Sequence, residues 1–262
     1  AYVVAAGPCF TVPTGHCDFG ETRLISTPEE AVAELRDLSG SKPNVVKVVF
    51  DNAGSKPTID KATLKAFLNE ARRLNIKSVV HIGSWSDIRK ASELGADAVT
   101  HLDALVEEDL LSDYPITAEN KVYFDWVAGI KADGALENRN DAIKRLDAAG
   151  VNILVGSDGG NFAVFQGVGF HREMYFLQQM SMSPWDIVLG STLKAYEFLG
   201  VDWGIEEGRP AHFTLHDRRI FEDLSLSTEV EDIYLHGRKV SRDPLLNYAN
   251  PGFFQYMKLF FG

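Results

Sequence analysis

Short apolar runs alternate with amphipathic stretches along most of the chain. Val45–Phe50 is a continuous run of β-branched and aromatic residues around one lysine, typical of a strand covered on both faces. Similar runs recur downstream, and between them apolar residues repeat at helical spacing. The alternation predicts a parallel sheet with helical crossovers. The predicted strands are Ala1–Gly7, Val45–Phe50, Lys77–Ile82, Ala98–Leu102, Lys121–Asp125 and Val151–Gly156.

Capping signals mark where several helices begin. Thr27 precedes Pro28 and two glutamates, which together form a helix start with an N-cap, a first-position proline and acids in the first turn. Asp60 caps a second amphipathic stretch in the same way. Further helices are predicted over Ser86–Leu94, Asn138–Ala149, Gly167–Met180 and Pro184–Leu199.

The pattern of predicted elements changes after Gly208. Short alternating strands with polar turns follow, over Ala211–Leu215, Val230–Leu235 and Arg238–Val240. We therefore divide the chain into a (β/α) portion, residues 1–203 and 244–262, and a small β-sandwich portion, residues 204–243. The aromatic tail from Pro244 is expected to pack on the body of the protein or on a second copy in a homo-oligomer.

Charge and composition narrow the range of partners. The chain carries 26 basic and 37 acidic residues, a net charge of −11. Nucleic acid and an anionic membrane surface both require clustered Lys and Arg, so neither is an expected partner. No stretch approaches the roughly 18 apolar residues of a membrane span, and no signal-peptide pattern follows Ala1, which favours a cytoplasmic location. Cys9 and Cys17 are the two cysteines: free, buried or reactive thiols are all possible, but a disulfide framework is not.

Polar residues stand inside or just after four of the predicted strands. Lys47 lies within Val-Val-Lys-Val-Val, His81 and His101 follow short apolar runs, and Asp158 follows Leu-Val-Gly-Ser. In a (β/α)8 barrel the carboxyl ends of the strands converge on one face, where catalytic groups gather. Imidazole and carboxylate are ligands for zinc and related ions. A lysine joins such a set only as a carbamate, formed with CO2, that can bridge two metals.

Each of these residues also has a simpler interpretation. A buried lysine is often a structural ion-pair partner, a single strand-terminal histidine is often a core or surface residue, and Asp158 in Gly-Ser-Asp-Gly-Gly is a good turn former. The placement of all four at the ends of successive strands favours the metal site. A chain of this length needs no metal for stability, so a bound metal is expected to be catalytic.

At these residues the sequence resembles the amidohydrolase superfamily, in particular its imidazolonepropionase-like and prolidase-like dipeptidase branch. The stretches that carry the resemblance are Thr14-Gly15-His16, Val46-Lys47-Val48, Val80-His81, residues 95–101 (Gly-Ala-Asp-Ala-Val-Thr-His), residues 149–158 (Ala-Gly-Val-Asn-Ile-Leu-Val-Gly-Ser-Asp) and residues 204–213 (Gly-Ile-Glu-Glu-Gly-Arg-Pro-Ala-His-Phe). The resemblance implies a TIM-type (β/α)8 barrel with a small β-sandwich. It also implies hydrolysis of an amide or peptide-like C–N bond.

The resemblance also assigns roles to the four residues. It implies a carboxylated Lys47 as the bridge between metals and His81 and His101 as ligands. Asp158 is then both a ligand and the general base and acid. The implied cofactor is one or two divalent ions, with zinc expected. His16 and His171 lie where this family often places groups that face the substrate, and Tyr123 is a candidate pocket residue, although all three are equally compatible with surface or core positions.

One family feature is missing from the sequence. The first strand of the family carries a His-x-His pair, and no His-x-His occurs in the 262 residues. If Asp158 follows strand eight, Ala1–Gly7 is strand three, and the chain holds six of eight strands. We therefore expect a missing N-terminal segment or a second chain to complete the barrel and the ligand set. The alternative is a truncated, non-catalytic relative that serves as a subunit or scaffold.

Overall fold

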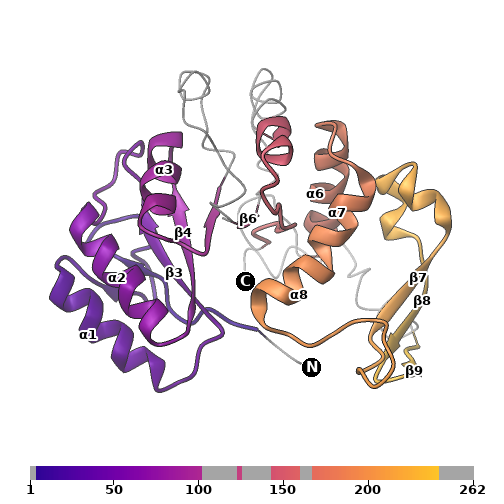
Figure 1. Ribbon diagram of the computed structural model, residues 1–262, viewed down its shortest axis with the longest axis horizontal. Coiled ribbons are helices and arrows are strands. Elements are labelled where there is room, and N and C mark those ends of the chain that lie inside the picture. Colours follow the sequence, from indigo (N-terminus) through magenta and orange to yellow (C-terminus); the bar gives the residue numbers. More distant parts are fainter. Residues whose placement is uncertain (1–3, 102–122, 126–142, 160–166, 242–262) are drawn as a thin grey trace, which may run out of the picture. The chain divides into compact units, whose positions relative to one another are not determined.

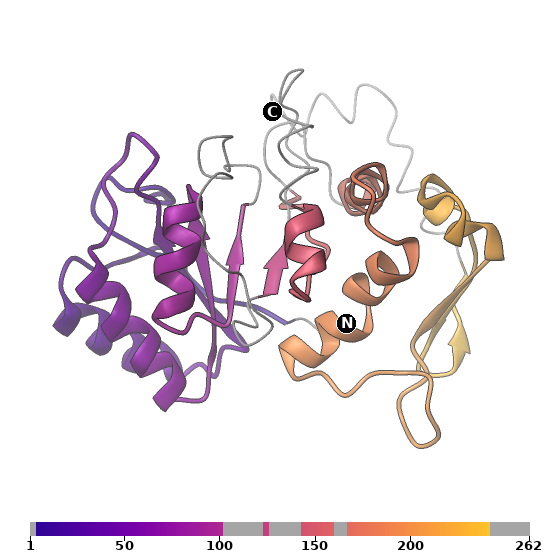
Figure 2. The ribbon, with the colours of Figure 1, turned by 45° about the horizontal axis from the view of Figure 1, so that its top comes forward.

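The computed structural model describes residues 4–101, the backbone of 123–125, and residues 143–159 and 167–241. The chain forms two compact units (Figures 1 and 2). Unit 1 contains Ala1–Asp202 and Arg219–Thr228, and unit 2 contains Trp203–Arg218 and Glu229–Gly262. The predicted placement of residues 244–262 lies outside the described residues.

A parallel sheet of six strands organises unit 1. The strand order is β2-β1-β3-β4-β5-β6, and every neighbouring pair is parallel. The two-residue strands β1 and β2 lie at one edge, and β3 and β4 form the longest ladder. The bounds are β1 Phe10–Thr11, β2 Arg23–Leu24, β3 Val45–Phe50, β4 Lys77–Ile82, β5 Ala98–Thr100 and β6 Tyr123–Asp125. The α/β class and the parallel sheet predicted from the sequence are thereby confirmed.

Helices α1 (Pro28–Ser39), α2 (Lys61–Arg73) and α3 (Trp85–Glu93) connect the strands β2 to β5. The predicted caps form: Thr27 makes a complete capping box with Glu30, and the Asp60 carboxylate accepts from the N–H of Thr63 at 2.7 Å. Ser84 caps α3 in the same way. These helices therefore begin where a capping side chain accepts a hydrogen bond from the first turn, and such capping residues can be recognised in the sequence.

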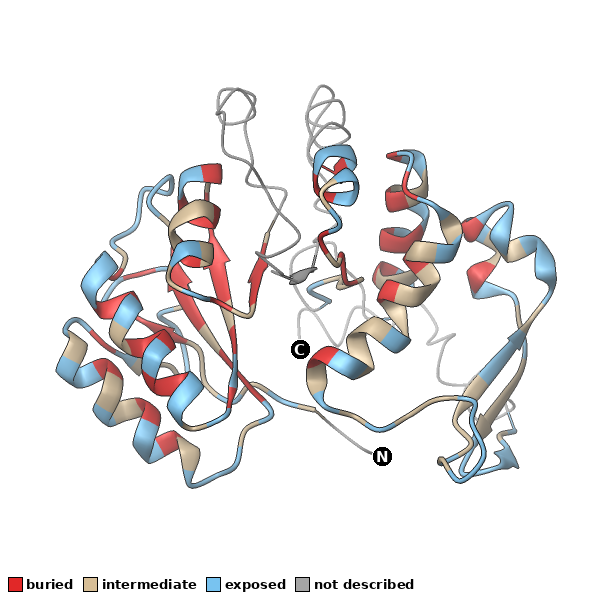
Figure 3. Ribbon diagram, viewed as in Figure 1, coloured by how far each residue is buried: buried red, intermediate tan, exposed pale blue. Residues whose placement is uncertain are grey.

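The sheet has one face packed against the helices and a second face that carries the polar residues. Val46, Val48 and Phe50 alternate along β3 and lie in the large apolar core with residues of α1 and α2. This core appears as the red segments of β3, β4 and the inner sides of the helices in Figure 3. Lys47 and Val49 point to the opposite face because side chains alternate along a strand. That face has a smaller apolar cluster built around Ala98, Leu154 and Phe198.

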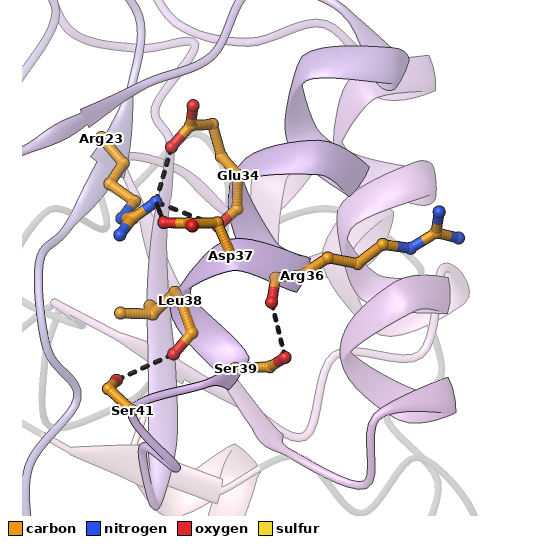
Figure 4. A network of polar contacts seen from close by, with 7 residues as sticks. All are labelled: Arg23, Glu34, Arg36, Asp37, Leu38, Ser39 and Ser41. Carbon is orange, nitrogen blue, oxygen red and sulfur yellow. Dashed lines mark hydrogen bonds and ion pairs between the residues drawn. The ribbon is translucent and has the colours of Figure 1, made fainter.

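Ion pairs fix the outer helices. Figure 4 shows Arg23 bridging Glu34 and Asp37 of α1, each at 2.7 Å, which ties β2 to the helix that follows it. Glu70 of α2 forms ion pairs at a more buried position. Its side chain is 6% exposed and accepts from Arg36 Nε of α1 at 2.7 Å and from Arg73 Nε at 2.9 Å. These hydrogen bonds lower the pKa of Glu70 to about 2.

The N-terminal part of the sheet differs from the prediction. Residues 4–6 carry no strand, and residues 1–3 lie outside the described part. The first strand is instead Phe10–Thr11, in a segment for which the sequence predicts no strand. The pairing of Phe10 with Val48 is non-local, and both side chains are fully buried. Burial against β3 therefore selects this strand despite the surrounding Gly, Pro and Thr.

Two further segments were predicted incorrectly. Val151–Gly156 forms only an isolated bridge at Ile153 and joins no strand ladder within the described residues. The predicted helix Pro184–Leu199 is two helices, α7 (Pro184–Ser191) and α8 (Leu193–Leu199). The break follows from Thr192, whose hydroxyl donates back to the carbonyl of Val188 at 2.6 Å and competes with the helical pattern. Helix α6 spans Val168–Gln179, and residues 143–148 are also helical, both as predicted.

Unit 2 contains a three-stranded antiparallel sheet. Strand β8 (Val230–Leu235) lies between β7 (Phe213–His216) and β9 (Arg238–Lys239). The three strands lie where the sequence predicts them, within two residues at each end. Two short 3-10 helices, Arg218–Phe221 and Leu224–Thr228, interrupt this unit in sequence. Within the described residues, no helix is long and apolar enough to cross a bilayer.

The Glu70 ion cluster gives a stability prediction. Glu70→Gln should lower the free energy of unfolding by roughly 1–2 kcal/mol at pH 7, because two guanidinium groups lose a buried partner. The folded-state pKa of Glu70 is depressed, so the stabilisation is complete above its unfolded pKa and is lost as pH falls toward about 2. Denaturant unfolding at several pH values measures the difference between variant and wild type, which should shrink below pH ~4.

A matched control is Glu93→Gln. Glu93 pairs with Lys61 at 3.6 Å, and both side chains are about half exposed. Such surface pairs contribute about 0–1 kcal/mol, so this variant should unfold almost as the wild type does at every pH. An equal loss of stability in both variants would contradict a special role for the Glu70 cluster.

Candidate functional site

Register in the sheet sets the positions of the candidate site residues. The Cα of His81 on β4 pairs with Val49 on β3 and with Thr100 on β5. Lys47 precedes Val49 by two residues and therefore points to the same face as His81. His101 directly follows β5. The ladder thus brings His81 and His101 to the carboxyl-terminal ends of β4 and β5, while Lys47, whose Cα pairs with Val79, lies on the same face in the first half of β3.

The imidazole rings of His16, His81 and His101 form one cluster. The centroid of His81 is 4.3 Å from that of His16 and 4.1 Å from that of His101. His81 is 6% exposed and lies between the other two, whereas His16 stands in the exposed loop after β1. The sequence predicted a substrate-facing role for His16 without indicating its proximity to His81, because the loop has no regular periodicity.

Two candidate residues adopt backbone conformations that L-amino acids seldom use. His101 has φ 78° and Asp158 has φ 48°. For His101 this left-handed conformation ends β5 and turns the side chain away from the direction that strand alternation would give it. Such conformations cost of order 1–3 kcal/mol and cluster at functional sites, where surrounding structure holds them. His101 thus combines a position directly after β5 with this backbone conformation, whereas Asp158 adopts it in a segment that joins no strand ladder within the described residues.

The histidines of the cluster are kept neutral. Burial, then the neighbouring His101, His16 and Lys47, lowers the pKa of His81 far below its usual value. Burial, followed by Lys47 and His16, lowers the pKa of His101 to about 3. The pKa of His16 is lowered by burial and by Lys47, against the opposing effect of Asp51 and Asp158. Neutral imidazoles offer lone pairs, which is the state that binds metals.

The imidazoles of His81 and His101 supply part of the ligand set that a divalent metal needs. The Nδ1 atom of His81 is buried and has no hydrogen-bond partner in the described structure, so this ring retains an unused coordinating atom. Neutral His81 and His101 supply two nitrogen ligands of the type that zinc prefers. Within the described residues, however, no group of three or more His, Cys, Asp or Glu is arranged to hold a metal. Among the described residues on this face of the sheet, Lys47 is the further side chain that the sequence predicts as a ligand.

Asp158 and Asp51 add negative charge beside the cluster. Both carboxylates act on His16, and Asp158 also acts on Cys17. Asp158 therefore acts electrostatically on His16, and its roles as metal ligand and proton carrier stay predictions. Asp51 was not singled out from the sequence, although it follows the buried strand β3 just as His101 follows β5. The rule that polar residues at strand ends gather at one edge applies equally to Asp51.

A fully buried aspartate holds the loops around Asp51. Asp87 of α3 is 0% exposed and accepts from the backbone N–H and the side-chain amide of Asn52, at 3.0 and 2.7 Å. It also accepts from the N–H of Gly83 at 3.3 Å. A Cβ at Gly83 would stand 1.8 Å from Asp51 Oδ1, so a larger residue would displace this carboxylate from the N–H groups of Ala53 and Gly54, from which it accepts hydrogen bonds. The ends of β3 and β4 are thereby fastened together.

The remaining candidates lie in different surroundings. His171 is on α6, and its Nδ1 lies 2.9 Å from the Ser227 hydroxyl, which links α6 to a 3-10 helix. Tyr123 opens β6, where its backbone pairs with Ala98; its side chain lies outside the described residues. Substrate binding by His16, His171 and Tyr123 stays a prediction.

The close approach at Gly83 generates a prediction. Gly83→Ala should destabilise the chain by about 1–3 kcal/mol, because the new methyl group overlaps the Asp51 carboxylate. In an Asp51→Ala background the same substitution should cost at least about 0.5 kcal/mol less, since the obstructing atoms are gone. Denaturant unfolding of the four proteins measures this coupling.

Gly40→Ala serves as the control. Gly40 has φ −59°, and its added Cβ would meet only the carbonyl oxygen of Asp37, at 3.4 Å. That variant should change stability by less than about 1 kcal/mol and show no coupling to Asp51→Ala. An equal cost for Gly83→Ala in both backgrounds would show that Asp51 does not occupy this position.

Solved structures resemble the fold over most of the chain. A Xaa-Pro dipeptidase with bound methionine has a TM-score of 0.72 at 18% identity, with 90% of this chain and 67% of that chain covered. A putative prolidase from Bifidobacterium longum has a TM-score of 0.72 at 22% identity, covering 95% and 70%. The A. niger ochratoxinase has a TM-score of 0.71 at 16% identity, covering 90% and 65%. The chain thus spans about two thirds of these proteins.

A match to a family model identifies the family of the chain. A comparison with curated protein sequences finds no match. The model of the amidohydrolase family, in contrast, matches residues 2–240, which is nearly the whole chain and includes Lys47, His81, His101 and Asp158. The resemblance inferred from motifs is confirmed: the chain belongs to the amidohydrolase family.

Proposed function

We propose that the chain is the larger part of a metal-dependent hydrolase that cleaves an amide or peptide-like C–N bond. The observation that carries the proposal is the convergence of His81 and His101, with ring centroids 4.1 Å apart, on a sheet face shared with Lys47. Membership of the amidohydrolase family supports it independently. The proposed architecture is a TIM-type barrel of which the six-stranded parallel sheet is a part.

Lys47, His81 and His101 are the proposed ligands for one or two divalent ions, with zinc the expected metal. The two histidines are neutral because burial lowers their pKa values, so neither needs to lose a proton before it coordinates. Lys47 takes part as a carbamate formed with CO2, which replaces its cation by an anionic oxygen donor. When bound, the metal would supply a water with a pKa of about 7 and polarise the scissile carbonyl.

Asp158 is the proposed proton carrier. Asp158 is exposed and acts electrostatically on His16. It accepts a proton from the attacking water and delivers it to the leaving nitrogen, which balances the reaction without a second acid. His16, which is exposed and lies beside His81, is the proposed substrate contact. Hydrogen bonds from Asn52 and Gly83 to Asp87 hold the loops at the ends of β3 and β4 together.

The substrate class follows from the family and from three relatives. The similar structures include a Xaa-Pro dipeptidase, a putative prolidase and an ochratoxinase. We propose dipeptides and N-acylated amino acids as the first substrates to test. Ligands beyond those of this sequence, which lacks a His-x-His pair, are proposed to come from a further segment or a second chain.

Metal content tests the proposal directly. The chain, expressed with zinc and bicarbonate, should hold at least one equivalent of zinc by elemental analysis. Lys47→Ala should weaken zinc binding at least about tenfold, because it removes one of the few donors. The same variant should lose hydrolysis of a dipeptide such as Met-Pro in the metal-loaded protein.

The matched control is Lys77→Ala on the neighbouring strand. Lys77 pairs with Asp97 at 3.0 Å at the amino end of β4, away from the cluster. This variant should keep both zinc and activity. A chain that holds no zinc, alone or with an added His-x-His segment, would overturn the proposal and favour the alternative, a non-catalytic subunit or scaffold.

A further inference from the structure

Unit 2 contains a second pair of contacting histidines. The ring centroid of His212, which directly precedes β7, lies 4.3 Å from that of His236, in the turn between β8 and β9. The spacing is close to the 4.1 Å between the rings of His81 and His101. Both members of the pair belong to the same compact unit, so the contact is internal to it. Neither has a role in the proposed hydrolysis.

The turn that carries His236 has a defined conformation. Only His236 and Gly237 separate β8 from β9, and both have positive φ, 51° and 72°. Positive φ at both central residues is what a type I′ hairpin turn requires. The N–H of Gly237 also donates to the carbonyl of Ala211 at 3.0 Å. The turn is therefore attached to the residue that precedes His212, and this attachment keeps the two imidazoles together.

The ring of His212 also contacts Trp203. The two rings are stacked, with centroids 4.7 Å apart and an interplanar angle of 29°. The carbonyl of Trp203 accepts from Arg209 Nη1 at 3.2 Å, and Arg209 pairs with Glu206 at 3.0 Å. The His212 ring is thus already ordered by its neighbours, so a ligand that binds it loses little affinity to ordering the side chain.

His212 has a coordinating atom that the rest of the protein leaves unused. Its Nδ1 is buried and has no hydrogen-bond partner in the described part of the chain. Buried polar atoms in native proteins nearly always have a partner, and a bound ion is one explanation where the protein supplies none. Packing of the two imidazoles alone would leave this nitrogen unsatisfied. His236 is exposed, so an ion can reach the pair from solvent.

We propose that His212 and His236 form a binding site for a divalent transition-metal ion, in addition to the candidate site of unit 1. Imidazole suits Zn²⁺, Ni²⁺ and Cu²⁺, whereas Mg²⁺ prefers oxygen ligands. No third His, Cys, Asp or Glu of the described residues is arranged to complete a ligand set, so water fills the other coordination positions. The bound ion links the β8–β9 turn to the start of β7. This site does not depend on the proposed hydrolysis.

Nickel titration of the full chain tests the proposal. Isothermal titration at about pH 8, where an ordinary imidazole is unprotonated, compares the wild type with His212→Phe and His236→Asn. Phenylalanine keeps an aromatic ring against Trp203 but has no donor atom, and asparagine tolerates the positive φ of the turn. Each variant should lose the same single equivalent of bound nickel or bind it at least about tenfold more weakly.

Thermal unfolding gives a second measurement on the same proteins. Nickel should raise the unfolding midpoint of the wild type more than that of either variant, because it binds the folded turn and not the unfolded chain. Without metal, all three proteins should unfold cooperatively, which shows that the variants are folded. Mg²⁺ in place of Ni²⁺ should give no difference between them.

His216→Asn is the matched control in the same unit. The Nε2 of His216 lies 3.0 Å from the Thr214 hydroxyl, and this variant should keep the full nickel content. Lys47→Ala should also keep the equivalent bound by His212 and His236, which separates this site from the proposed hydrolase site. Full nickel binding by both variants of the pair would overturn the proposal. A loss in only one of them, or an equal loss in His216→Asn, would overturn it as well.

Discussion

The parallel register of β3, β4 and β5 is the constraint on which the rest of the site depends. The pairing of His81 with Val49 on one side and Thr100 on the other places three strand ends at the same level of the sheet. In this register Lys47 pairs with Val79, two residues before His81, and shares a face of the sheet with it. A shift of one residue on β3 would send Lys47 to the apolar face among Val46 and Val48. Apolar packing against α1 and α2 therefore fixes the chemistry on the opposite face.

Burial then sets the state of the site residues. The histidines lie in a region with little solvent and with Lys47 nearby, and both factors disfavour a second cation. One electrostatic environment thus keeps both imidazoles neutral. Carboxylation of Lys47 would replace its positive charge by a negative one and remove this repulsion.

Sequence patterns were sufficient where local and global preferences agree. The strands Val45–Phe50 and Lys77–Ile82 and the cap at Asp60 lie where they were predicted, since β-branched runs and capping residues encode them locally. Failures occur where tertiary contacts decide. The strand Phe10–Thr11 depends on pairing with β3, and the break at Thr192 depends on back-bonding to a carbonyl. The proximity of His16 to His81 was not predictable, because the loop that carries His16 has no periodic signal.

The central claim is that Lys47, His81 and His101 bind a metal together. Zinc-edge X-ray absorption combined with anomalous diffraction on crystals of the zinc-loaded chain tests it most directly. The account predicts an anomalous peak at the carboxyl ends of β3, β4 and β5, with zinc–nitrogen distances of about 2.0–2.1 Å to His81 and His101 and an oxygen from the Lys47 carbamate. A peak confined to His212 and His236 of unit 2, whose rings lie 4.3 Å apart, would contradict it.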